Sequence, residues 1–129
     1  MFYTAYISSK ITVIIMERKD DLDYLFLEDI MAAESKFQRE LKKDIETLFP
    51  GSIVLKTDPT YRQGIPDLIV FWNDKWAALE CKRAKSAPHR PNQDYYIDVM
   101  NEMSYSSFVY PENKEEVLNG LQQAFGVSR

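Results

Sequence analysis

The sequence has few of the residues that build disulfide-stapled or zinc-clamped domains, with a single cysteine and a single histidine among its 129 residues. Cys81 alone cannot form an internal disulfide framework, and it cannot supply a cysteine-rich zinc module of the ordinary type. Chains without disulfides are typical of reducing compartments. We therefore expect a cytoplasmic protein whose stability comes from a hydrophobic core.

Long hydrophobic runs are missing as well. Near the N-terminus the longest uninterrupted run covers residues 13–16, well short of the roughly 18 apolar residues that a membrane span requires. Lys10 is the only basic residue ahead of this run and Glu17 follows it directly, so a secretory signal peptide also fits poorly. The sequence predicts a soluble protein with no membrane partner.

Basic residues are fewer than acidic residues, which gives a net charge of -4 and a pI near 5.0. A surface that is basic throughout is excluded, although clustered basic residues can still form a local nucleic-acid site. Apolar residues are abundant, because 45% of the residues are hydrophobic and 13% are aromatic. This composition suits one compact domain and excludes a wholly disordered chain.

Apolar spacing predicts the elements of that domain within residues 33–129. A helix is expected over residues 33–49, where the apolar stripe is Phe37, Leu41, Ile45 and Leu48. Glu34 and Gln38 continue this stripe toward the N-terminus of the helix, so they should face inward. Strands are expected at residues 52–57, 66–72, 76–82 and 106–110, the second and third joined as a hairpin.

Two further helices complete the predicted order. The first runs from about residue 92 to 103, with an inner stripe of Tyr96, Val99, Met100 and Met103. The second begins near residue 111, with an inner face of Val117, Leu118, Leu121 and Phe125. The resulting order, α-β-β-β-α-β-α, predicts an α/β domain with a mixed central sheet flanked by helices.

Residues 1–32 form an N-terminal extension to this domain. Residues 2–16 have the composition of a strand, and residues 17–23 form a charged break after it. Two interpretations stay open. Either this segment is a peripheral strand that pairs at a sheet edge or between protomers, or Met16 is an alternative start and residues 1–15 are dispensable.

Three charged residues are predicted to meet at one end of the hairpin. Asp67 opens the second strand, while Glu80 and Lys82 lie at the end of the third strand, on the same face and opposite Cys81. Two carboxylates and the Cys81 carbonyl are hard oxygen ligands that suit Mg²⁺ or Mn²⁺, and Glu34 is placed to complete the set. The alternative is a structural ion pair, with Glu34 acting only as an acid near a helix N-terminus.

A basic stretch without acidic residues follows this strand, and its members are Arg83, Lys85, His89 and Arg90. Because it adjoins the acidic residues, we expect it to contact the DNA backbone. The alternatives are a merely solvated loop, or DNA that enters along the first helix over Lys36, Arg39, Lys42 and Lys43.

Taken together, these residues resemble a nuclease signature. Gly64-Ile65-Pro66-Asp67, twelve further residues and then Glu80-Cys81-Lys82 resemble the PD-(D/E)XK nuclease superfamily. The pair Glu34 and Gln38, with Gln93 at the start of the next helix, is similar to the VRR-NUC branch and small phage-type nucleases. The resemblance covers about residues 33–125 and implies a restriction-endonuclease-like αβββαβ core.

The resemblance also implies roles. Asp67 and Glu80 would be metal ligands and Lys82 the catalytic lysine, with Glu34 as an additional acid. Gln93 would lie beside the active site, although as a first-turn polar residue it could be structural. The implied function is a Mg²⁺-dependent DNA endonuclease, a homodimer that cuts branched DNA such as Holliday junctions, in host cytoplasm if phage-encoded. The alternative is an inactive DNA-binding accessory protein with a nuclease fold.

Overall fold

The computed structural model describes residues 2–6, 12–17 and 21–127, with side chains from residue 26 to residue 127. Its elements along the chain are β1 (Phe2–Tyr6), β2 (Thr12–Glu17), α1 (Asp21–Leu48), β3 (Ile53–Lys56), β4 (Leu68–Trp72), β5 (Lys75–Cys81), α2 (Gln93–Met103), β6 (Tyr105–Val109), a 3₁₀ turn (Pro111–Asn113) and α3 (Lys114–Ala124). The predicted α/β class with a mixed sheet flanked by helices is confirmed.

The main sheet has four strands in the order β3-β4-β5-β6. β4 is antiparallel to both β3 and β5, and β6 runs parallel to β5. β4 and β5 form the predicted hairpin, because Trp72 pairs with Lys75 across a turn in which Asn73 has a φ of 56°. This hairpin places the start of β4 beside the end of β5.

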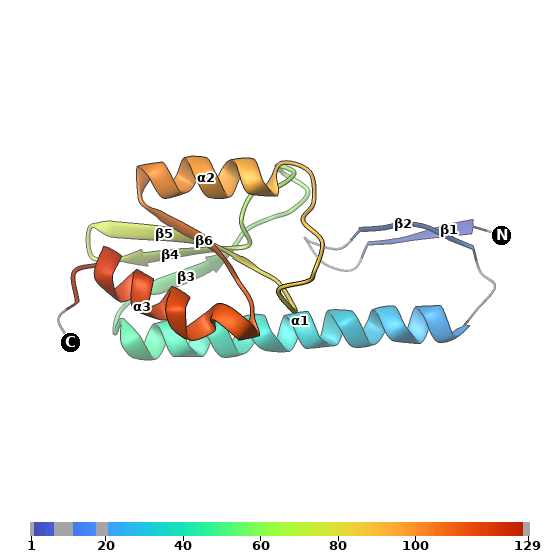
Figure 1. Cartoon of the computed structure of the whole chain (residues 1–129), viewed down its shortest axis with the longest axis horizontal. Coiled ribbons are helices and arrows are strands. Elements are labelled where there is room, and N and C mark those ends of the chain that lie inside the picture. The colour runs from blue at the N-terminus through green and yellow to red at the C-terminus, as the bar shows by residue number, and fades with distance from the viewer. Residues whose placement is uncertain (1, 7–11, 18–20, 128–129) are drawn as a thin grey trace.

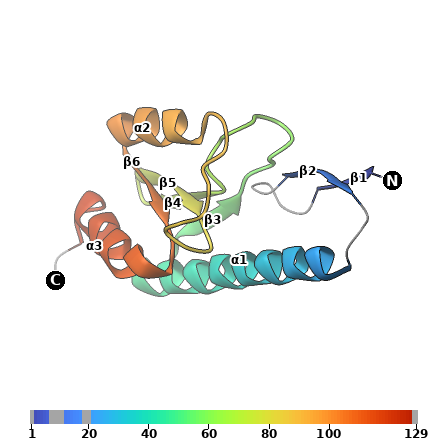
Figure 2. The same ribbon diagram turned by 45° about the vertical axis from the view of Figure 1, so that its right-hand side comes forward.

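Helices cover the two faces of this sheet, as Figures 1 and 2 show: α1 and α3 lie on one face and α2 on the other. The core fills the space between α1, α3 and the sheet, with Leu41, Ile45 and Leu121 fully buried in it. All four inner residues predicted for the last helix are buried, and Phe125 makes an edge-to-face contact with Phe49. Apolar stripes at helical spacing therefore predicted the packing of α1 and α3.

The first helix is longer than predicted. It begins at Asp21 rather than near residue 33, so the expected boundary between residues 32 and 33 falls inside one continuous helix. The expectation that the charged break reaches residue 23 is wrong for residues 21–23. No proline or glycine interrupts residues 21–48, and residues such as Leu27, Glu28 and Met31 favour a helix without needing a buried face. Figure 1 shows α1 continuing beyond the sheet.

The strand composition of residues 2–16 corresponds to two strands. β1 and β2 are antiparallel to each other and make a two-stranded sheet separate from the main one. The predicted strand at a sheet edge is therefore a hairpin-like pair within the extension itself. Residues 7–11 and 18–20 lie outside the described residues, and the alternative start at Met16 stays a prediction.

The inner face of α2 also differs from the prediction. Its buried residues are Gln93 and Ile97, whereas Met103 is 69% exposed and Tyr96 is only half-buried. The buried face of α2 starts with a glutamine, and apolar spacing does not indicate which polar residues face inward. This miss matters for the site, because it is Gln93 that faces inward.

The main sheet carries three large exposed apolar side chains, Ile53, Leu55 and Phe71. Ile53 pairs with Phe71 on the sheet face opposite the core. β3, which carries two of them, is an edge strand. Among the described helices, none is long and apolar enough to cross a bilayer.

Candidate active site

Asp67 and Glu80 meet where β4 begins and β5 ends, as the hairpin predicted. Leu68 pairs with Leu79, so the residues just outside this pair come together. The Asp67 N–H donates to Glu80 Oε1 at 3.2 Å, and the Cys81 N–H donates to Asp67 Oδ2 at 3.1 Å. Each of the two acidic residues is 1% exposed. Two carboxylates are therefore held against one short stretch of backbone in the interior.

The alternation along β5 separates this polar site from the core. Ala77, Leu79 and Cys81 belong to the hydrophobic core beneath α1, which confirms Cys81 as a small core residue. Glu80 and Lys82 lie on the opposite side, and Lys82 is 3% exposed. One strand thus supplies an apolar face to the core and a charged face to the site.

Gln93 links the two charged residues of this strand. The Lys82 ammonium donates to Gln93 Oε1 at 2.6 Å and lies 3.9 Å from Glu80 Oε2. The Gln93 amide donates in turn to Glu80 Oε2 at 2.7 Å. A glutamine is suited to this position because its oxygen accepts and its nitrogen donates. Gln93 therefore contacts both Lys82 and Glu80.

Backbone groups of the loop between β5 and α2 hold this network from outside. The Pro88 carbonyl accepts a second hydrogen bond from Lys82 at 3.0 Å. The Arg90 N–H donates to Gln93 Oε1 at 2.8 Å. No sequence pattern indicated these contacts, because any residue type provides a backbone carbonyl and almost any provides an N–H.

The loop that leads to Asp67 is fitted to the start of α2. Gly64 has a φ of +89°, and a Cβ added there would lie 2.6 Å from the Asn92 Cβ. Arg62 donates to the Tyr96 hydroxyl at 3.1 Å, while the Thr57 N–H donates to the Asp67 carbonyl at 2.8 Å. Gly64 is therefore required by close packing, and it sets the position of Asp67 relative to Gln93.

Glu34 lies on α1 and is 5% exposed, which confirms that it belongs to the inner face. Gln38, one turn later, is half-buried. Among the side chains that the structure describes, no three from His, Cys, Asp and Glu gather into a metal-binding group. The ligand role of Glu34 stays a prediction, and the acidic pair of the site is Asp67 with Glu80.

The basic loop is free of acidic residues in sequence but not in space. His89 Nδ1 lies 2.7 Å from the Asp94 carboxylate, and its ring stacks on Phe108 with the centroids 4.1 Å apart. The Lys85 N–H donates to the Glu112 carboxylate at 3.1 Å. The Lys85 side chain is exposed, whereas Arg83 and Arg90 are partly buried. The contact of these residues with DNA stays a prediction.

Comparison of the chain with protein-family models, with curated proteins and with solved structures gives no match in any of the three. The nuclease resemblance therefore stays a prediction from the residues themselves. Any assignment of function rests on the chemistry of the Asp67–Glu80–Lys82–Gln93 network.

Proposed function

We propose that this chain is a metal-dependent nuclease of the PD-(D/E)XK type that hydrolyses phosphodiester bonds in DNA. The observation that carries the proposal is the buried contact of Asp67 with Glu80, with the Lys82 ammonium 3.9 Å from Glu80. Two carboxylates and one ammonium on adjoining strand ends are the groups that metal-assisted phosphate hydrolysis uses.

The burial of two carboxylates at one place supports a divalent cation. Asp67 and Glu80 are both in the interior, and a cation bound by both would offset the cost of burying their charges. Carboxylate oxygens and the Cys81 carbonyl form a hard donor set of the kind that Mg²⁺ and Mn²⁺ accept, with water in the remaining positions. When bound, such an ion polarises a phosphoryl oxygen and lowers the pKa of a coordinated water.

The residues of the chain have distinct tasks in this proposal. Asp67 and Glu80 would hold the cation, and Glu34 from α1 would be an additional acid. Lys82 directs its ammonium at the reacting phosphate and offsets the negative charge that develops there. Gln93 is a positioning residue, because its amide fixes both the Lys82 ammonium at 2.6 Å and the Glu80 carboxylate at 2.7 Å.

A purely structural ion pair is the competing explanation. Buried ion pairs are seldom more stabilising than apolar side chains of the same volume, so stability alone is a weak reason to place Glu80 and Lys82 here. The same reasoning weighs against an inactive accessory protein, because DNA binding alone does not need Asp67, Glu80 and Lys82 together. An activity assay separates these explanations from the nuclease.

The proposed substrate is branched DNA such as a four-way junction, and the proposed assembly is a homodimer. A two-fold dimer would place two sites on opposite strands of a junction. Light scattering tests the dimer directly. The exposed apolar face around Leu55, beside the edge strand β3, is the first surface to alter, because patches of this kind often mark interfaces. Leu55→Lys would leave a dimer intact if the interface lies elsewhere.

The deciding experiment incubates the purified protein with supercoiled plasmid, linear duplex, single strand and four-way junction, each with Mg²⁺, Mn²⁺ or EDTA. Metal-dependent cleavage is expected, with the junction preferred. Glu80→Gln, prepared in parallel, controls for contaminating nucleases because it keeps the shape of the side chain. Binding without cleavage under every metal would overturn the enzyme and leave the accessory protein.

A further inference from the structure

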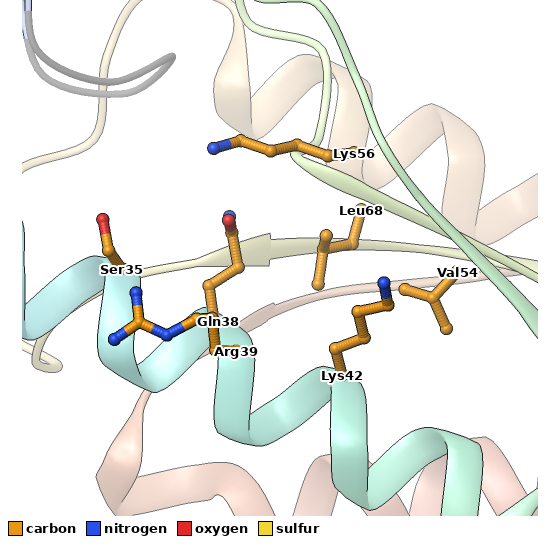
Figure 3. Close-up of a pocket in the computed structure, with 7 residues that line it drawn as sticks. All are labelled: Ser35, Gln38, Arg39, Lys42, Val54, Lys56 and Leu68. Carbon is orange, nitrogen blue, oxygen red and sulfur yellow. The ribbon is translucent and has the colours of Figure 1, made fainter.

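A second charged region lies between α1 and the edge strand β3. It is a cavity of about 350 Å³ lined by Ser35, Gln38, Arg39, Lys42, Val54, Lys56 and Leu68. Three of these side chains are cations, and none is acidic. The α1 cations follow one another by three residues, so they share a helix face, and Lys56 reaches the cavity from the strand (Figure 3).

These three cations have no carboxylate partner among the residues that the structure describes. Lys36 on the same helix differs, because it lies 4.0 Å from the Glu40 carboxylate. Arg39, Lys42 and Lys56 are all exposed, and like charges around one cavity repel one another. An anion in the cavity would remove that repulsion, so the charge pattern favours an anionic ligand.

Neutral donors accompany the cations. Figure 3 shows the Gln38 amide rising from α1 into the cavity and Lys56 extending across it from β3, with the Ser35 hydroxyl on the same side of the helix. Arginine, lysine, amide and hydroxyl groups together offer many N–H and O–H donors in several directions. A phosphate group, with several oxygens around a tetrahedral centre, matches this arrangement.

The cavity adjoins the candidate active site along two elements. Ser35 directly follows Glu34 on α1, and Leu68 directly follows Asp67. Lys56 pairs with Leu68, and the next residue, Thr57, donates to the Asp67 carbonyl at 2.8 Å. The cavity therefore adjoins the acidic site at the start of β4, with Leu68 on the core face of the sheet and Glu80 on the opposite face.

We propose that this cavity, with Arg39, Lys42 and Lys56, binds a backbone phosphate of the DNA strand that flanks the phosphate at the Asp67–Glu80 site. The inference rests on the proposed nuclease function for the identity of the polymer. Its own basis is the cluster of like charges beside the acidic site. It assigns to β3 and α1 a role in holding the substrate strand.

The test compares two triple variants that change the net charge equally. Arg39→Gln/Lys42→Gln/Lys56→Gln neutralises the cavity, and Lys36→Gln/Lys43→Gln/Lys75→Gln neutralises two helix cations and one strand cation outside it. Binding of labelled duplex and four-way junction is measured by fluorescence anisotropy in EDTA at several salt concentrations. The single variant Lys56→Gln is measured as well, in case the triple variant folds poorly.

The cavity variant should bind DNA at least about tenfold more weakly, since charge-assisted hydrogen bonds are lost. Its salt dependence on duplex should flatten by about 0.9 for each phosphate that the cavity neutralises. The control triple variant should keep the wild-type slope. Equal slopes in the two triple variants would overturn the inference, even if the wild-type chain cleaves DNA.

Two further outcomes separate this inference from the nuclease. DNA binding that depends on the cavity, in a wild-type chain without cleavage, would support the inference and overturn the enzyme. A parallel titration with inorganic phosphate, followed by the backbone amide NMR signals of Ser35 and Lys56, distinguishes a free anion from the polymer. Signal shifts with phosphate but no affinity for DNA would overturn the strand-binding role.

Discussion

The network around Lys82 and the cavity beside α1 both hold charged side chains, but they differ in how those charges are compensated. In the network, Glu80, Lys82 and Gln93 are almost fully buried and satisfy one another through hydrogen bonds. In the cavity, Arg39, Lys42 and Lys56 are exposed, share one sign and have no carboxylate partner among the described residues. The network pairs charges of opposite sign within the protein, whereas the cavity gathers charges of one sign.

This difference separates stability from binding. Removing one member of a buried network leaves its partners without compensation, so the fold itself is affected. Removing an exposed cation from a repelling cluster leaves the fold almost unchanged, so the effect is confined to ligand affinity. Variants of the network therefore need a stability measurement beside the activity assay, while variants of the cavity report on binding directly.

The largest effect is expected when an acidic member of the network loses its charge. Asp67→Asn and Glu80→Gln keep the side-chain shape but weaken cation binding, so cleavage should fall at least about a hundredfold, or about 2.7 kcal/mol in the barrier. Cleavage rates at saturating Mg²⁺, with thermal melting as a check on folding, measure this. Near-wild-type cleavage by Glu80→Gln would show that the active site lies elsewhere.

The next effect is on stability and tests the balance within the network. Lys82→Met keeps the apolar stem but removes the cation beside the Glu80 carboxylate and one of the two donors to Gln93 Oε1, so unfolding should become about 3–5 kcal/mol easier. Glu80→Gln/Lys82→Met should recover part of that loss, because the uncompensated charge is gone. Urea unfolding measures both variants. Lys75→Met, an exposed lysine on the same strand, should change stability by less than about 0.5 kcal/mol.

A smaller effect is expected from the packing that supports the network. Gly64→Ala meets both a left-handed backbone and a close contact with Asn92, so it should cost about 2–4 kcal/mol and slow cleavage. Gly51 has a similar φ of +85° with no atom within 4 Å of an added Cβ. Gly51→Ala should therefore cost only about 1 kcal/mol. Equal losses in the two variants would mean that backbone strain, and not the fit against α2, is what Gly64 provides.

The smallest effect concerns an exposed carboxylate in the loop before Asp67. The Thr60 hydroxyl and the Thr60 N–H both donate to the Asp58 carboxylate. Together, with the hydroxyl as the larger cause, they hold the pKa of Asp58 below its ordinary value of 3.8. Because the pKa of Asp58 is lower in the folded state, these two hydrogen bonds stabilise the fold at pH values above the unfolded-state pKa. That stabilisation is lost as the pH falls through the folded-state pKa. Thr60→Val removes the hydroxyl donor, so the pKa of Asp58 should rise.

An NMR titration of the Asp58 carboxyl checks this shift, and cleavage at neutral pH should stay unchanged. An unaltered pKa in Thr60→Val would show that the hydroxyl does not hold Asp58 in solution. Exposure to water limits what such a bond contributes to stability, in contrast to the buried contacts of Glu80.

Local patterns predicted much of the fold and half of the network. A short turn between two strands with period-2 alternation was sufficient to bring Asp67 to Glu80 and to place Cys81 on the other face. Helical spacing was sufficient to bury Leu41 and Leu121. These features depend on residues that are close in sequence or related by one turn, where backbone geometry leaves few alternatives.

Other features depended on contacts that no local pattern encodes. The start of α1 at Asp21 was missed because an exposed helix has no apolar stripe to trace. The burial of Gln93 and Ile97 depended on how α2 lies over β5, since a glutamine on an inner face makes sense only with Glu80 and Lys82 opposite. The approach of Asp94 to His89 likewise required the folded loop.

The sequence by itself determined the α/β class, the hairpin and the meeting of Asp67 with Glu80, because strand and helix periodicities act over a few residues. Only the tertiary structure decided that Gln93 bridges Lys82 and Glu80, and that Lys56 joins Arg39 and Lys42 around one cavity. Those groups lie on helices and strands that no strand register or helical spacing relates, so they meet only when the helices pack on the sheet and the core fixes their relative positions.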